Sequence, residues 1–200
     1  MSVALIDYGA GNLHSVHNAL KAAGARDIVV TADPEVVRRA ERIVLPGVGA
    51  FGACAGGLRC IPGMVEAMEE RALNGGVPFL GVCVGMQLMA TRGLEHGAHD
   101  GLGWIAGEVA PIMPAEGVRV PHMGWNDVVP TSPHPLIVGG EAYFLHGYAF
   151  TGESVLATTS HGGTLTAAIG RDNLAGVQFH PEKSQRYGIA LMERFLAWRP

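Results

Sequence analysis

The sequence carries little charge and contains no long apolar run. Of its 200 residues 16% are charged, with a formal net charge of -4, whereas about 25% of an average globular chain is charged. No run of Lys or Arg provides the basic surface that nucleic acids require. No stretch of about 18 apolar residues is present to span a membrane, and the opening MSVALIDYG lacks a basic targeting region. We therefore expect a cytoplasmic protein that binds neither nucleic acid nor membrane.

Cysteine is also scarce. The three residues, Cys54, Cys60 and Cys83, form an odd set without a CxxC pair, which argues against a disulfide framework or a structural zinc site. The hydrophobic share of 48% excludes disorder, and 200 residues suit a single domain spanning 1–200. The 29 glycines and 12 prolines show no period, so they indicate tight turns and not a repeat.

The first half of the chain alternates strand and helix patterns. Short β-branched runs predict strands, and helical spacing of apolar residues predicts helices. Asp33 is placed to cap a helix that begins at Pro34, whose missing N–H costs nothing there. The other elements are strands at 3–7, 28–31, 42–46 and 78–82 and helices at 13–23 and 64–73. Because parallel strands require such crossover helices, the pattern predicts an α/β fold with a doubly wound, mostly parallel sheet.

From Gly101 onward the spacing becomes that of hairpins. We expect a loop over 123–135 and then strands at 142–150, 154–160, 165–170 and 175–180, with a turn at 171–173. Antiparallel strands are therefore expected to join the sheet in the second half. A closing amphipathic helix is predicted over 186–198.

Cys83 lies in a segment, FLGVCVGMQ, that joins an apolar strand to a helical run over 86–91. The G-x-C-x-G pattern is typical of a nucleophile elbow, a sharp turn in which the flanking Gly81 and Gly85 avoid collisions. Such a turn directs the sulfur outward and places it at a helix N-terminus, which favours the thiolate. It also leaves the N–H of Val84 free to bind an oxyanion. The alternative is a buried structural cysteine. For Cys54 and Cys60, packing or loop positions are expected.

His180 is the best candidate for the base that such a nucleophile needs. A thiolate requires an imidazole to transfer protons, and the imidazole requires an acceptor that orients it. His180 ends the apolar strand AGVQF, and Pro181 stops that strand. Glu182, two residues on, is able to accept from the ring. The alternative is a histidine at a strand end whose hydrogen bonds are satisfied and which has no catalytic role.

Two glycine-rich turns follow strands in the first half. In PGVGAF, the N–H groups of Gly47, Val48 and Gly49 could complete an oxyanion hole that Val84 cannot form alone. The turn DYGAGN resembles a dinucleotide-binding fingerprint, but His14 stands where the third glycine is required. Packing of the first helix, or a surface near a partner, is the better interpretation of that turn.

These motifs together resemble the class I glutamine amidotransferase family. LGVCVGMQLM and HPE carry the family signature, and the resemblance covers essentially the whole chain through IDYGAGNLHSV, LPGVGAFG, PHMGWNDV, YFLHGYAF and GVQFHPEKSQRYG. Among family members, the opening segment, HMGWN and HPEKS most resemble the glutaminase subunits of imidazole glycerol phosphate synthases. The resemblance implies a triad of Cys83, His180 and Glu182 that hydrolyses glutamine to glutamate and ammonia through a thioester.

The resemblance also implies which residues hold the glutamine. They are Gln87 and the segment formed by His146, Gly147 and Tyr148. Members of the family often have serine in place of Gly147, so a backbone contact is expected there and a side-chain contact is not. Val84 and the Gly47–Gly49 loop are implied to form the oxyanion hole.

A partner subunit is implied as well. Ammonia would pass to a (β/α)8-barrel cyclase subunit in a heterodimer, where it reacts with PRFAR to give imidazole glycerol phosphate and AICAR in histidine biosynthesis. Trp125, Asn126 and Lys183 resemble residues that meet this partner. No metal or organic cofactor is implied.

Two other functions stay open at this point. The chain could be the glutaminase of another synthase, such as one making anthranilate or pyridoxal phosphate, although HMGWN and HPEKS argue against it. It could also be a scaffold or regulatory subunit that keeps the elbow without catalysis.

Overall fold

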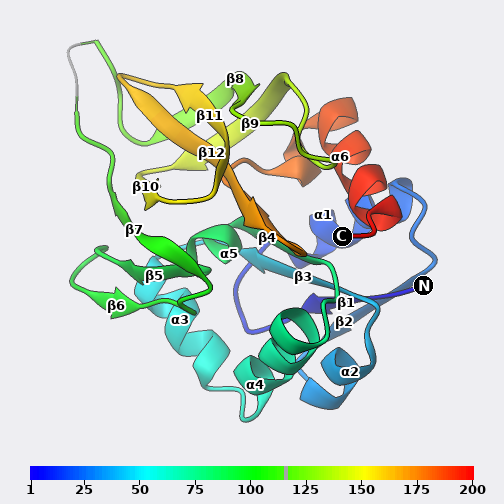
Figure 1. Cartoon of the computed structure of the whole chain (residues 1–200). Coiled ribbons are helices and arrows are strands. Elements are labelled where there is room, and N and C mark those ends of the chain that lie inside the picture. The colour runs from blue at the N-terminus through cyan, green and yellow to red at the C-terminus, as the bar shows by residue number, and fades with distance from the viewer. Residues whose placement is uncertain (115–116) are drawn as a thin grey trace.

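Two sheets organise residues 1–114 and 117–200, which are the residues that the computed structural model describes (Figure 1). The larger sheet has nine strands, in the order β2 (Asp27–Thr31), β1 (Ser2–Ile6), β3 (Arg42–Gly47), β4 (Phe79–Cys83), β13 (Leu174–Val177), β12 (Thr164–Arg171), β11 (Val155–Ser160), β8 (His122–Pro130) and β9 (Gly140–His146). The smaller sheet has four, in the order β10 (Tyr148–Gly152), β7 (Ile105–Pro111), β5 (Ala90–Gly93) and β6 (His99–Asp100).

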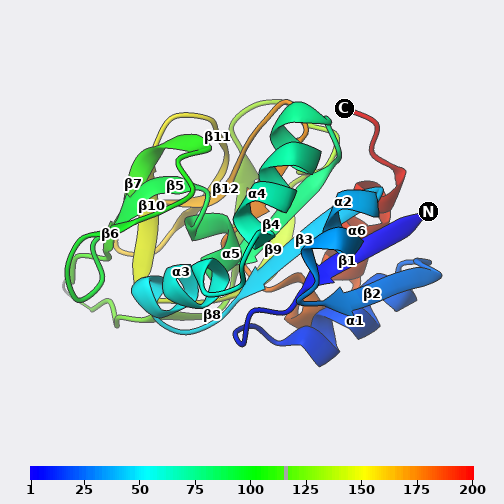
Figure 2. The same cartoon turned by 90° about the horizontal axis from the view of Figure 1, so that it is seen from below.

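The first five strands in this order, β2, β1, β3, β4 and β13, run parallel to one another. β3, β4 and β13 are buried along their whole length, as parallel strands covered on both faces should be. α1 (Leu13–Ala22) and α6 (Gln185–Ala197) pack together on one face, and α2 (Pro34–Arg39) and α4 (Met64–Glu69) lie on the other (Figures 1 and 2). The α/β class and the doubly wound arrangement are therefore confirmed.

Local signals placed several elements correctly. Asp33 caps α2 by accepting a hydrogen bond from the N–H of Glu35 at 2.8 Å. The helix predicted over 64–73 forms as α4 followed by a π-helical turn, Glu70–Asn74. The turn at 171–173 joins β12 to β13.

Three expectations were wrong, each because long-range pairing decides the structure. The loop expected over 123–135 is largely strand β8, which pairs with β9 from His122 to Val128. The strand expected over 142–150 breaks at Gly147, because β10 pairs with β7 in the second sheet. The helix expected over 86–91 stops after one turn as α5 (Val84–Gln87), since the chain then enters β5 beside β7.

One helix was not predicted, α3 (Phe51–Arg59), with the sequence FGACAGGLR. Its three glycines obscure the helical pattern, but one of them is needed for packing. A Cβ at Gly57 would lie 2.9 Å from the carbonyl oxygen of Tyr8. The glycine therefore allows α3 to lie directly against the turn after β1.

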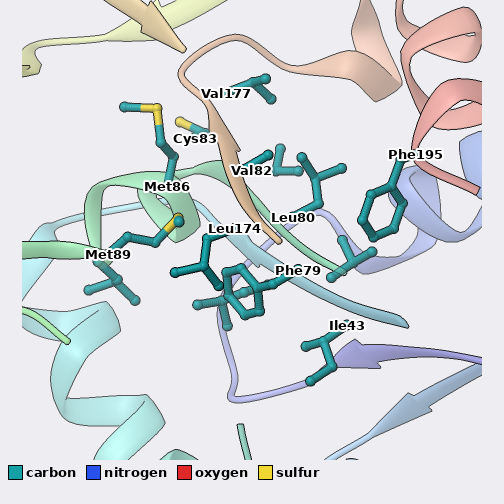
Figure 3. Packing of buried hydrophobic residues seen from close by; sticks show 14 of the residues in the cluster. Ile43, Phe79, Leu80, Val82, Cys83, Met86, Met89, Leu174, Val177 and Phe195 are labelled. Carbon is teal, nitrogen blue, oxygen red and sulfur yellow. The ribbon is translucent and has the colours of Figure 1, made fainter. Parts of the chain in front are cut away.

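The apolar core fixes the strand ends from which the site is built. Phe79 and Leu80 of β4 pack beside Leu174 of β13, and Cys83 lies where β4 ends (Figure 3). Val82 and Val177 are 1% and 0% exposed. Burial of such a side chain contributes about 1.5–3 kcal/mol, so the ends of β4 and β13 are held firmly side by side.

Candidate active site

Cys83 sits at the turn between β4 and α5 in a strained backbone conformation. Its φ of 54° lies in the left-handed region, which is costly for any residue with a Cβ. The glycines on either side make the turn possible. A Cβ at Gly81 would lie 2.7 Å from the carbonyl oxygen of Gly85, and a Cβ at Gly85 would lie 1.9 Å from that of Leu45. The elbow geometry inferred from G-x-C-x-G is therefore present.

Gly85→Ala is expected to destabilise the fold, because its methyl group would collide with backbone that has no room to move. The cost should be about 1–3 kcal/mol or more, the usual range for overpacking. Gly56→Ala is the matched control, since a Cβ at Gly56 in α3 meets nothing within 4 Å and alanine is favoured over glycine in a helix by up to about 1 kcal/mol. Urea unfolding followed by circular dichroism measures both changes. Equal shifts of the midpoint would argue against a tight elbow.

His180 and Glu182 lie beside the nucleophile. β13 is the parallel neighbour of β4, with Val82 opposite Val177, so the chain that leaves each strand arrives at the same sheet edge. His180 Nδ1 is 2.8 Å from Glu182 Oε1, and the two side chains are 3% and 1% exposed. This nitrogen donates and the carboxylate accepts.

The imidazole of His180 is held in its charged form. Burial lowers its pKa, but hydrogen bonds to Cys83 and Glu182, together with their charges, outweigh that effect and raise the pKa to about 10. An imidazolium beside the sulfur stabilises a thiolate, the form of cysteine that acts as a nucleophile.

Ser184 fixes the backbone of this turn and was missed by sequence reasoning. Its hydroxyl donates to the carbonyl oxygen of His180 at 2.7 Å and accepts from the N–H of Tyr143 at 2.9 Å. The N–H of His180 donates to the carbonyl oxygen of Tyr143, also at 2.9 Å. A serine just before a helix signals an N-cap, yet here the hydroxyl ties His180 to β9.

The predicted oxyanion residues surround Cys83. Gly47 pairs with Cys83 in the sheet register, while Val48, Gly49 and Val84 line the pocket above the sulfur. Gly49 has a φ of 104°, which only glycine adopts readily. The structure brings these residues to one place, and their role in binding an oxyanion stays a prediction.

Three side chains that the sequence did not indicate hold the loop before α3. The Tyr8 hydroxyl donates to the carbonyl oxygen of Pro46 at 2.7 Å, and burial raises the pKa of this phenol so that it stays protonated. The Cys54 thiol donates to the carbonyl oxygen of Val48 at 3.4 Å. Glu95 accepts from the N–H of Phe51 at 2.7 Å. Through Tyr8, the DYGAGN turn thus supports the loop before α3.

A pocket of about 230 Å³ opens above Cys83. Gln87 holds its wall by donating to the carbonyl oxygen of Tyr148 at 3.1 Å and to Gln178 Oε1 at 3.0 Å. Gln178, another residue missed in the sequence, places its amide nitrogen 3.7 Å from Cys83 Sγ. The pocket is lined by Val48, Gly49, Cys83, Val84, Gln87, Glu95, Pro121, Leu145, His146, Gly147, Tyr148, His180 and Lys183.

Residues 4–197 match the family model described as Glutamine amidotransferase class-I. The chain belongs to the class-I glutamine amidotransferase family. The match extends over nearly all of the sequence, and the elbow, the histidine and the carboxylate lie inside it.

Individual members of the family are similar to this amidotransferase over their full length. The HisH subunit of imidazole glycerol phosphate synthase from Zymomonas mobilis is 60% identical over 206 residues, covering 100% of this chain and 97% of that one. The HisH subunit from Rhodopseudomonas palustris is 50% identical over 216 residues, covering 100% of both.

Solved structures share the fold of this amidotransferase. A crystal structure of a glutamine amidotransferase superposes with a TM-score of 0.76 at 20% identity, covering 98% of each chain. PurLQS from Thermotoga maritima superposes with a TM-score of 0.75 at 17% identity, covering 98% of this chain and 97% of that one. At these identities the likeness concerns the fold alone.

The residues predicted to meet a partner do not share one face of this amidotransferase. Trp125 points outward from β8 and is 48% exposed, and Lys183 Nζ lies 6.0 Å from the ring centre of Tyr143 on the same side. Asn126, the next residue in β8, points to the opposite face, as strand geometry requires. Its amide nitrogen donates to the carbonyl oxygen of Ser160 at 2.8 Å. A partner contact by each of the three residues stays a prediction.

All three cysteines are free, with Cys54 and Cys83 buried and Cys60 exposed. Across residues 1–114 and 117–200, no group of three or more His, Cys, Asp or Glu side chains is placed to hold a metal ion. Within those same two segments, no helix has the length and apolar character needed to cross a membrane.

Proposed function

We propose that this chain is the glutaminase subunit of an imidazole glycerol phosphate synthase. Cys83 attacks the side-chain carbonyl carbon of glutamine, His180 transfers protons, and Glu182 orients the imidazole. The observation that carries the proposal is the strained Cys83 elbow beside a buried His180 that donates to Glu182. The 60% identity to the Zymomonas mobilis HisH subunit supports the choice of synthase.

The proposed reaction turns glutamine and water into glutamate and ammonia. The thiolate bonds to the amide carbon, and the electron pair of the carbonyl moves to oxygen, where N–H groups of Val84 and of the Gly47–Gly49 loop stabilise it. The imidazolium of His180 protonates the leaving nitrogen, the C–N bond breaks, and ammonia departs from a thioester. His180 then takes a proton from water, which attacks the thioester and releases glutamate and the thiolate.

Glutamine is proposed to lie along the wall formed by Gln87, His146, Gly147 and Tyr148. These residues line the same pocket as Cys83. Gly147 has space beside it, since a Cβ there would approach only Pro121, at 4.0 Å. A contact from the Gly147 backbone, with no side chain involved, fits this position.

We propose a (β/α)8-barrel cyclase subunit as the partner in a heterodimer. Ammonia that escapes to water becomes ammonium and loses its nucleophilic lone pair, so a dry route to the acceptor protects it. In the partner, ammonia would react with PRFAR to give imidazole glycerol phosphate and AICAR.

The docking face for this partner is the outer face of the β8–β9 pair, formed by Met123, Trp125, Tyr143 and Leu145. The strand register sets Met123 opposite Leu145 and Trp125 opposite Tyr143, so the four side chains share one face. Met123 is 65% exposed and Leu145 is 37% exposed. An exposed tryptophan among apolar side chains is typical of an interface centre, and Leu145 also lines the pocket.

The test of this function compares glutaminase rates of the chain alone, with the cyclase subunit, and with the cyclase carrying its ligand. We expect weak activity alone and a marked increase in the liganded complex, because an uncoupled glutaminase would waste glutamine. Equal rates in all three conditions would overturn the coupling.

The same experiment separates the alternatives. Activation by an anthranilate or pyridoxal phosphate synthase partner would assign the chain to another pathway. A non-catalytic scaffold would show no glutaminase activity in any complex. We further propose a single domain over 1–200, a cytoplasmic location and a reaction that needs no metal or organic cofactor.

A further inference from the structure

We propose that His122 is a positioning residue for the glutamine pocket. Its Nδ1–H holds His146 as a neutral ring in the pocket wall, and its Nε2 ties that ring to Asn126 behind the docking face. The proposal rests on the proposed function, because it concerns how the same pocket holds its substrate.

The hydrogen bonds of the two histidines determine where their protons lie. His146 Nδ1 is 2.9 Å from the carbonyl oxygen of Tyr148, which only accepts, so this nitrogen carries the proton. His146 Nε2 therefore accepts, and His122 Nδ1 donates to it at 2.9 Å. His122 Nε2 in turn accepts from the amide of Asn126 at 3.0 Å. The donors point in one direction, from Asn126 to Tyr148.

The packing around His122 leaves its ring little freedom. The ring stacks between Phe144, with centroids 4.7 Å apart, and His161, with centroids 4.2 Å apart. The sheet register sets His122 directly opposite His146, and the two residues are 3% and 6% exposed. Every ring nitrogen of the pair has a partner, so the arrangement specifies one orientation and one tautomer for each ring.

The hydrogen-bond network continues to the nucleophile. The carbonyl oxygen of Tyr148 accepts both from His146 and from Gln87. Gln87 donates to Gln178, whose amide nitrogen contacts Cys83 Sγ. A shift of the Tyr148 carbonyl would therefore move the side chain that lies between the pocket wall and the sulfur.

The network also keeps the wall neutral beside a charged site. Burial lowers the pKa of His146 to about 4, with the charges of His161 and His180 acting in the same direction and the bond to Tyr148 opposing them. Burial also lowers the pKa of His122 to about 4, and repulsion from His146 and His161, when they are protonated, acts in the same direction. A proton on His146 Nε2 would face the N–H of His122 and add a second positive charge near His180. The other titratable groups lining the pocket are Cys83, Glu95, Tyr148 and Lys183.

Two amide variants of His122 separate positioning from mere filling of space. In His122→Asn the amide nitrogen takes the place of ring Nδ1 and can still donate to His146. In His122→Gln the amide lies near the place of Nε2, so the donor to His146 is lost. Both variants are neutral and polar, and His134→Gln is the control because His134 is a half-buried histidine packed on Trp198, outside the pocket residues.

The experiment measures kcat and KM for glutamine from pH 5 to 9 with the cyclase complex. We expect His122→Gln to raise KM roughly tenfold, the scale of one lost buried hydrogen bond, while kcat changes less. As the pH is lowered, its kcat/KM should also begin to decline at a higher pH than that of the wild type, because His146 can now bind a proton at Nε2. His122→Asn and His134→Gln should keep the wild-type KM and pH profile. Equal behaviour of the two His122 variants would overturn the proposal.

Histidine nitrogen NMR gives a readout that needs no activity. The wild type and His122→Asn should show His146 with its proton on Nδ1 down to about pH 5, whereas His122→Gln should show a raised pKa for His146. An unchanged His146 signal in His122→Gln would also overturn the proposal. Absence of glutaminase activity in the wild-type complex would instead count against the proposed function, so the two failures are distinguishable.

Discussion

Replacing Cys83 by alanine is expected to abolish glutamine-dependent product formation by the complex and to leave ammonia-dependent formation intact. In the proposed reaction the sulfur is the atom that bonds to the substrate carbon, and alanine provides no nucleophile in its place. Free ammonia would bypass this step, since the acceptor chemistry is proposed to take place in the partner. Assays of the complex with glutamine or with an ammonium salt at alkaline pH measure the two activities. Loss of both activities would place the defect in folding or assembly and would contradict the assignment.

A covalent label tests the same residue in the isolated chain. A glutamine-like diazoketone should add one adduct to the wild type, and intact mass with peptide mapping should place it on Cys83. Cys60 is the matched control, because it is free and exposed but lies outside the pocket lining. Cys60→Ala should label like the wild type, and Cys83→Ala should not label. An adduct on Cys60 alone would favour the scaffold interpretation.

The elbow was predictable because its geometry depends on a few neighbouring residues. A left-handed residue between a strand and a helix requires small neighbours, and Gly81 and Gly85 meet that requirement within nine residues of sequence. The structure supplies the reason for each glycine, since the atoms that a Cβ would strike are backbone atoms. Local steric rules of this kind can be read from sequence.

The meeting of Cys83 with His180 was predictable from chemistry and not from spacing. A cysteine at one strand end and a His-x-Glu at another suggested that the two strands adjoin. The parallel pairing of β4 with β13 is the fact that joins them, and no local pattern encodes it. Family resemblance supplied what the pattern could not.

The supporting residues could not be found in the same way. Ser184, Gln178 and His122 act through partners that are distant in sequence, and their roles depend on the register of β8, β9 and β13. The segment around HMGWN was predicted as a loop, which removed any basis for setting His122 opposite His146. Buried polar networks require the sheet register before they can be recognised.

In the proposed function, each face of the β8–β9 pair has a role of its own. Its outer side chains form the proposed docking face, and its inner side chains hold the pocket wall. Because neighbouring residues of a strand point in opposite directions, Trp125 and Asn126 belong to different faces yet cannot move independently. A partner that docks on the outer face is thereby connected to the glutamine site through one strand.

His180→Asn is expected to lower glutamine-dependent turnover by roughly 10²-fold or more, the scale of a lost general base. The asparagine amide nitrogen can take the place of Nδ1 and keep a hydrogen bond to Glu182, so the variant removes proton transfer while retaining orientation. Steady-state rates of the complex with glutamine measure the loss, and ammonia-dependent synthesis serves as the control. A wild-type rate in His180→Asn would exclude His180 as the proton carrier.

Glu182→Gln should lower glutamine-dependent turnover less than Cys83→Ala does, because it weakens the orientation of His180 and leaves the nucleophile in place.

His180→Asn should also change how stability depends on pH. The pKa of His180 is raised to about 10 in the folded protein, while an unfolded histidine has a pKa of about 6.5. Its charged form therefore stabilises the fold fully below about pH 6.5, and this contribution declines as the pH rises and is lost near pH 10. Urea unfolding at pH 6 and pH 10 should show the wild type losing more stability than His180→Asn over this interval. If both proteins lose stability equally, the charged form of His180 does not stabilise the fold.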